Sequence, residues 1–135
     1  MILVDSNVLL DIFTNDPQWY SWSSEKIQEY AEQEALAINP IIYAEISIAY
    51  SSSEELDEML PSDQFQRLDL PYEGGFLAGK CFNEYKKRRG FKQTPLPDFY
   101  IGAHAITENL TLLTRDLKRY RTYFPKIKLI VPGNS

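Results

Sequence analysis

Short apolar runs separated by helical segments are the feature that most restricts the folds open to this chain. Ile2-Leu3-Val4 is such a run and ends at Asp5, and residues 35–38 and 110–114 form two more. Continuous apolar runs of this length are typical of strands that are buried on both faces of a parallel sheet. Because helical patterns separate them, the sequence predicts an α/β domain.

The remaining elements follow from local signals along the chain. Asn39-Pro40 is a favourable N-cap and first-turn pair, so a helix is expected to begin there. A length of 135 residues suits one domain, which we expect to cover residues 1–135. We expect helices over 8–13, 19–33, 40–50, 54–60, 72–89 and 98–109, a weak edge strand over 65–68 and a last strand over 128–131.

Four acidic residues stand in apolar surroundings, whereas most others lie on polar helical faces. Asp5 and Asp116 follow predicted strands, and in a parallel sheet such positions share the edge at which sites form. Glu45 lies in an apolar helical segment, and Asp98 begins a mostly apolar helix. A carboxylate in such a setting costs several kcal/mol unless it is paired or coordinated.

Each of these acids also has a simpler explanation, because an aspartate can cap a helix and Glu45 can pair with a basic residue. If the four converge, however, their repulsion requires a cation. Oxygen ligands suit Mg²⁺ or Mn²⁺, and a chain with one cysteine and one histidine is poorly equipped for zinc. Asn7 and Thr114 are small polar residues at strand ends that can orient Asp5, Asp116 or a metal-bound water.

The net charge of −5 argues, taken alone, against a nucleic-acid partner. It is unevenly distributed, however. Residues 1–79 hold 15 acidic and 2 basic residues, whereas residues 80–135 hold 4 acidic and 12 basic ones. Candidate RNA-binding cations in the basic part are Arg115, Lys118, Arg119, Arg121, Lys86 and Lys87, with Tyr120, Tyr123 and Phe124 available to stack on bases.

Four segments of the chain resemble, in the same order, the motifs of PIN domains. In length and sequence the chain is most similar to the subgroup VapC, the toxin of a type II toxin–antitoxin pair. The four segments are Ile2–Leu10, Asn39–Glu45, Leu96–Ala105 and Leu112–Asp116. Any one of them is a weak signal, but four at this spacing are specific. The resemblance covers roughly residues 1–131.

The resemblance implies a three-layer α/β/α fold with a central parallel sheet of about five strands. It also implies a magnesium-dependent endoribonuclease (manganese being possible) of the cytoplasm. The longest apolar stretches are too short to cross a bilayer, so we expect no membrane segment. RNA, a VapB-like antitoxin and a second copy of the chain are the partners that the resemblance implies. By position, the catalytic and metal-binding acids are Asp5, Glu45, Asp98 and Asp116, with Asn7 and Thr114 as supporting polar residues.

Other readings fit less well. A haloacid-dehalogenase-like phosphatase needs a second aspartate where Asn7 stands, and a receiver domain needs an acidic pair where Ser6 and Asn7 stand. The remaining alternative is a non-catalytic PIN-fold module that binds RNA or protein. The complete set of four acids argues against that alternative.

Overall fold

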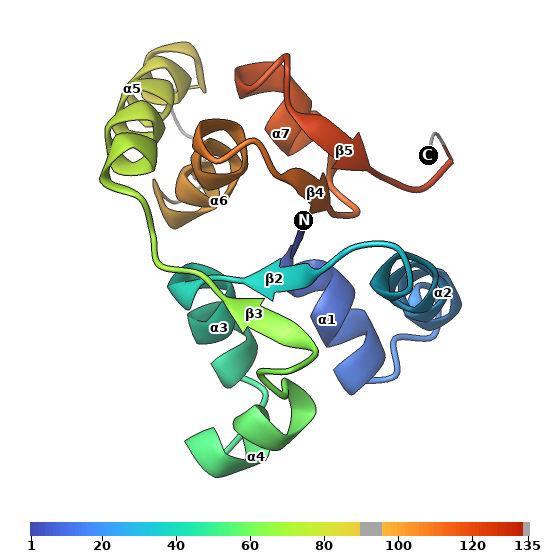
Figure 1. Cartoon of the computed structure of the whole chain (residues 1–135). Coiled ribbons are helices and arrows are strands. Elements are labelled where there is room, and N and C mark those ends of the chain that lie inside the picture. Colours follow the sequence, from blue (N-terminus) through green and yellow to red (C-terminus); the bar gives the residue numbers. More distant parts are fainter. Residues whose placement is uncertain (90–95, 134–135) are drawn as a thin grey trace.

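The computed structural model describes residues 1–89 and 96–133, and these contain a five-stranded sheet in which every pairing is parallel (Figure 1). The strand order is β3-β2-β1-β4-β5, so the first strand lies in the centre. The strands are β1 (Ile2–Val4), β2 (Leu36–Ile38), β3 (Phe65–Arg67), β4 (Thr111–Leu113) and β5 (Lys128–Ile130).

Helices cover both faces of this sheet and make the expected three-layer α/β/α fold. The first four helices lie on one face and the last three on the other (Figure 1), as right-handed crossovers to either side of β1 require. The helices are α1 (Ser6–Phe13), α2 (Tyr20–Ala31), α3 (Pro40–Ser47), α4 (Ser53–Met59), α5 (Tyr72–Arg89), α6 (Leu96–Thr107) and α7 (Leu117–Tyr123).

The apolar runs form the strands that the sequence predicts. All three residues of β1 and of β2 are buried, and β3 lies at one edge of the sheet, as expected. Among the helices, α3 ends at Ser47 rather than at the expected residue 50, and α6 begins at Leu96. No helix in the described part of the chain is both long and apolar enough to cross a membrane.

The helix α7 is absent from the sequence-based expectation. Its seven residues include three basic ones, and Tyr120 is the buried side chain among them. One buried position gives no apolar stripe, so the periodicity that reveals the other helices is missing. The helix instead begins at its cap, where the side chain of Asp116 accepts the N–H of Arg119 at 3.2 Å.

The single histidine joins the two faces of the sheet near its carboxyl edge. Asn39 caps α3 by accepting the N–H of Ile42, and its Nδ2 lies 3.0 Å from Nδ1 of His104 on α6. Nε2 of His104 lies 3.1 Å from Oε1 of Glu108. His104 is fully buried, and these contacts keep the beginning of α3 against α6.

Candidate active site

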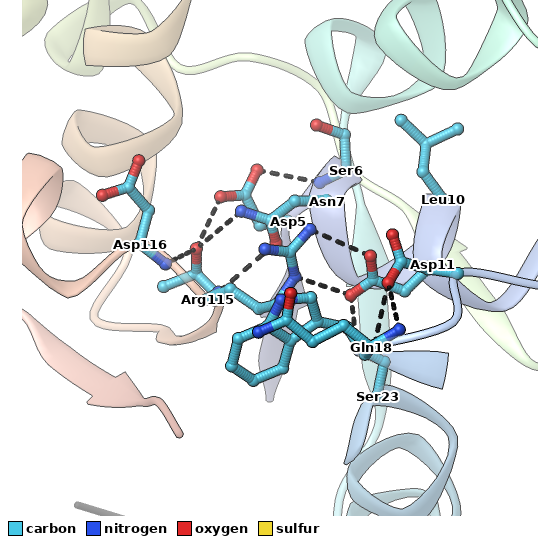
Figure 2. A network of polar contacts seen from close by, with 12 residues as sticks. Asp5, Ser6, Asn7, Leu10, Asp11, Gln18, Ser23, Arg115 and Asp116 are labelled. Carbon is cyan, nitrogen blue, oxygen red and sulfur yellow. Dashed lines mark hydrogen bonds and ion pairs between the residues drawn. The ribbon is translucent and has the colours of Figure 1, made fainter. Parts of the chain in front are cut away.

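Asp5 is the most enclosed of the four predicted acids. It follows β1, caps α1 and is 2% exposed. Its Oδ1 accepts the N–H of Ser6 at 2.8 Å (Figure 2). Its Oδ2 accepts the hydroxyl of Thr114 at 2.8 Å and that of Tyr120 at 2.9 Å. Burial raises the pKa of Asp5, and these donors together with the charge of Arg119 lower it only in part.

Thr114 holds the end of β4 against the end of β1. Besides donating to Asp5, its Oγ1 accepts the N–H of Asp116 at 3.1 Å and the side-chain N–H of Asn7 at 3.4 Å. The Oδ1 of Asn7 accepts the N–H of Arg115 at 3.3 Å. Asn7 therefore supports Asp5 through Thr114, and Thr114 contacts the backbone of Asp116 rather than its carboxylate.

Glu45 and Asp98 bring two further carboxylates toward Asp5 from α3 and α6. Oε1 of Glu45 accepts the hydroxyl of Ser6 at 2.8 Å. Burial raises the pKa of the Glu45 carboxyl to about 7; the hydrogen bond from Ser6 opposes this rise, whereas the charges of Asp98 and Asp5 add to it. Asp98 is 8% exposed in the first turn of α6. Ser6 thus contacts both Asp5 and Glu45. The sequence signal for this residue is its position next to Asp5.

Asp116 joins the group through Arg119. Nε of Arg119 lies 3.2 Å from Oδ2 of Asp116, and its Nη1 lies 3.7 Å from Oδ2 of Asp98. Burial alone would lower the pKa of the guanidinium, but the charges of Asp98 and Asp116 outweigh it and raise that pKa. The arginine that was expected to bind RNA thus lies among the acids, with 37% of its side chain exposed.

The other predicted RNA-binding cations divide into engaged and exposed side chains. Arg115 pairs with the buried Asp11 through two contacts of 2.7 and 2.9 Å (Figure 2) and lies over the ring of Trp19. Arg121 donates to the carbonyls of Pro125 and Ile127. Lys118, Lys86 and Lys87 are exposed, with Lys87 3.9 Å from Glu84 and Lys86 over the ring of Phe82.

The expectation that Tyr120 and Phe124 stack on bases is wrong, because both are buried, at 0% and 4% exposure. Tyr123 packs its ring against Tyr85 and Phe99. Tyr120 is instead a residue of the acidic site, since its hydroxyl donates to Asp5. The sequence signal for this role is faint: Tyr120 is one helical turn after Asp116.

The donor set suits a hard divalent ion, because it consists of carboxylates that repel one another, and two of them, Asp5 and Asp98, are buried. Asp5, Glu45, Asp98 and Asp116 are the side chains that can hold such an ion. Across residues 1–89 and 96–133, however, no three Asp, Glu, His or Cys side chains form a ready-made metal group. At present both oxygens of Asp116 and one oxygen of Asp98 face Arg119.

The family model of the PIN domain matches residues 2–125 of this chain. No curated protein sequence matches it.

Several solved structures have the same fold as this chain. VapBC2 from Rickettsia felis, bound to a DNA fragment from its promoter, matches with a TM-score of 0.71 at 23% identity, over 97% of this chain and 98% of the other. FitAcB from Neisseria gonorrhoeae matches with a TM-score of 0.71 at 20% identity over 100% of both chains. A toxin–antitoxin complex from Klebsiella pneumoniae matches with a TM-score of 0.66 at 19% identity over 96% of both.

Proposed function

Because the chain belongs to the PIN domain family, we propose that it is a metal-dependent endoribonuclease and the VapC-type toxin of a toxin–antitoxin pair. The observation that carries the proposal is the placement of four carboxylates, from the ends of β1 and β4 and from α3 and α6, at one edge of the sheet. Sites in parallel sheets form at this edge. The match to toxin–antitoxin structures supports an antitoxin as the protein partner.

Asp5, Asp98 and Asp116 would hold a Mg²⁺ or Mn²⁺ ion, and Glu45 would complete the site. Such an ion, when bound, lowers the pKa of a coordinated water and neutralises charge on a phosphate oxygen. Three hydrogen-bond donors keep the carboxylate of Asp5 in one orientation, so this ligand is positioned before the ion arrives.

Glu45 is suited to move the proton of the attacking water. In the metal-free chain the pKa of its carboxyl is raised to about 7, and a carboxylate beside the attacking water can act as its general base. The hydroxyl of Ser6 donates a hydrogen bond to Oε1 of Glu45, and this bond sets the direction of the carboxylate.

The substrate would be RNA, drawn by the basic second part of the chain. Lys86 and Lys87 on α5 and Lys118 on α7 are exposed and available to phosphates. A second copy of the chain and the antitoxin would cover exposed apolar side chains such as Ile48, Tyr72 and Phe76.

The proposal is tested by incubating the purified chain with structured RNAs in Mg²⁺, in Mn²⁺ and in EDTA, and sequencing the new ends. We expect defined cuts that need the metal. Asp5→Asn and Asp98→Asn should each reduce the cleavage rate by about 100-fold or more, whereas Asp63→Asn, at an exposed acid outside the site, should not.

Two results would contradict the proposal in different ways. Cleavage that persists in EDTA would rule out the metal mechanism. RNA binding without cleavage under all conditions would favour the non-catalytic PIN-fold module.

A further inference from the structure

The guanidinium of Arg119 lies between Asp98 and Asp116, where a positive charge offsets the repulsion between the carboxylates. It contacts Asp116 at 3.2 Å and Asp98 at 3.7 Å, and it lies close enough to Asp5 to lower the pKa of that carboxyl. One positive charge thus interacts favourably with three of the four carboxylates, Asp5, Asp98 and Asp116.

These contacts use the oxygen atoms that a metal ion would need. Oδ2 of Asp116 faces Nε of Arg119, while its Oδ1 accepts the backbone N–H of the same residue at 3.2 Å. Both oxygens of Asp116 are therefore bound by Arg119, and Oδ2 of Asp98 faces Nη1.

We infer that Arg119 is a resident counter-ion of the acidic site, which positions Asp98 and Asp116 without metal and which a divalent ion must displace. This inference rests on the proposed function, because it concerns the same site. Since the ion and the guanidinium compete for the same oxygens, Arg119 stabilises the metal-free protein and weakens its affinity for metal. Arg119→Met should therefore have opposite effects on these two quantities, whereas the loss of a merely structural contact would lower both.

The test compares the full-length chain with Arg119→Met, Arg119→Lys and Lys118→Met, each stripped of metal. Lys118 is the control because it is exposed on the same helix and carries the same charge, whereas the ion pairs of Asp98 and Asp116 are with Arg119. Mn²⁺ affinity is measured by titration with detection of free Mn²⁺ by electron paramagnetic resonance, and thermal unfolding is measured in EDTA and in excess Mn²⁺.

We expect Arg119→Met to bind Mn²⁺ about 3- to 10-fold more tightly than the original chain, as two partly exposed ion pairs allow. It should unfold at a lower temperature in EDTA and recover in Mn²⁺. Arg119→Lys keeps the charge but lacks the planar guanidinium, so its Mn²⁺ affinity should lie between those of the original chain and Arg119→Met. Lys118→Met should change Mn²⁺ affinity by less than about 2-fold.

The inference is overturned if the original chain binds Mn²⁺ and Arg119→Met binds it no more tightly, or no more tightly than Lys118→Met does. If Arg119→Met does not fold, an unchanged affinity in Arg119→Lys overturns it equally. Failure of the proposed function looks different, because neither the original chain nor any variant would then bind Mn²⁺.

Discussion

At the scale of single residues, the site depends on how two acids are held. Asp5 is surrounded by donors, whereas Glu45 has one donor and two negative neighbours. The first arrangement favours a fixed carboxylate, and the second a carboxylate that exchanges a proton near neutral pH.

Tyr120→Phe should remove one of the donors to Asp5 while leaving the ring packed. Because the hydroxyl is buried, we expect a loss of about 1 kcal/mol in the free energy of unfolding, with a clear fall in RNA cleavage. The control is Tyr100→Phe, which removes a bond of 2.7 Å to the carbonyl of Pro71. Urea unfolding should show equal losses of stability for the two variants. Cleavage assays should show reduced RNA cleavage for Tyr120→Phe and not for Tyr100→Phe. Equal cleavage by both variants would contradict a role for Tyr120 at the site.

Glu45 should make the metal-free protein less stable as pH rises from about 4.5 to about 7. The pKa of this carboxyl is raised from 4.5 to about 7 in the folded chain, so between these values the folded state holds a proton that the unfolded state has lost. Glu45→Gln should remove this part of the pH dependence. Thermal unfolding in EDTA across this range measures it, with Glu25→Gln, at an exposed glutamate, as the control. Parallel curves for the original chain and Glu45→Gln would refute the assignment.

At the scale of elements, the close approach of α6 and α7 determines where Tyr120 lies. Gly102 is the point of contact: a Cβ atom there would lie 2.5 Å from Cε2 of Phe124 and 3.0 Å from Cδ1 of Tyr120. A side chain at this position would therefore push α7 away from α6. It would also displace the hydroxyl of Tyr120, which donates to Asp5.

Gly102→Ala should consequently lower the free energy of unfolding by about 1–3 kcal/mol. Gly79→Ala on α5 is a matched control, because a Cβ there meets nothing within 4 Å. That substitution should raise stability by about 0.5–1 kcal/mol, since alanine is the better helix former. Urea unfolding of the two variants should give changes of opposite sign. A neutral Gly102→Ala would show that the two helices can move apart freely.

The elements also show where sequence reasoning succeeds and where it stops. Buried strands such as β1 are apolar throughout, and Asn39-Pro40 marks the beginning of α3, so both are predictable from local sequence. The helix α7 has one buried side chain, and its contribution depends on Gly102 in another element. Likewise, the pairing of Arg115 with Asp11 joins residues far apart in sequence that carry no shared local signal. The four acids were predicted as a group, but the arginine among them was not.

At the scale of the whole molecule, charge separates the chain into two parts that meet at the site. Asp5 and Glu45 come from the acidic part, and Asp98 and Asp116 from the basic part. Lys86, Lys87 and Lys118 of the basic part are exposed, and the contacts of Lys86 with the Phe82 ring and of Lys87 with Glu84 are long, at 5.7 and 3.9 Å. RNA affinity should therefore depend on these lysines.

A double substitution, Lys86→Gln with Lys87→Gln, should weaken RNA binding and reduce its dependence on salt. For single-stranded RNA the slope of log affinity against log salt should fall by about 1.4 if both lysines contact phosphates. Filter binding in EDTA measures it, with Lys26→Gln in the acidic part as the control. An unchanged slope would place the RNA elsewhere on the surface.

The central position of β1 also has a consequence in time. Its partner β4 pairs Leu113 with Val4, and Thr114 and Tyr120 of this later segment hold Asp5. A ribosome synthesises Asp5 and Glu45 before β4 and α7, which complete the surroundings of Asp5. A nascent chain therefore lacks the assembled surroundings of Asp5 until α7 has been synthesised.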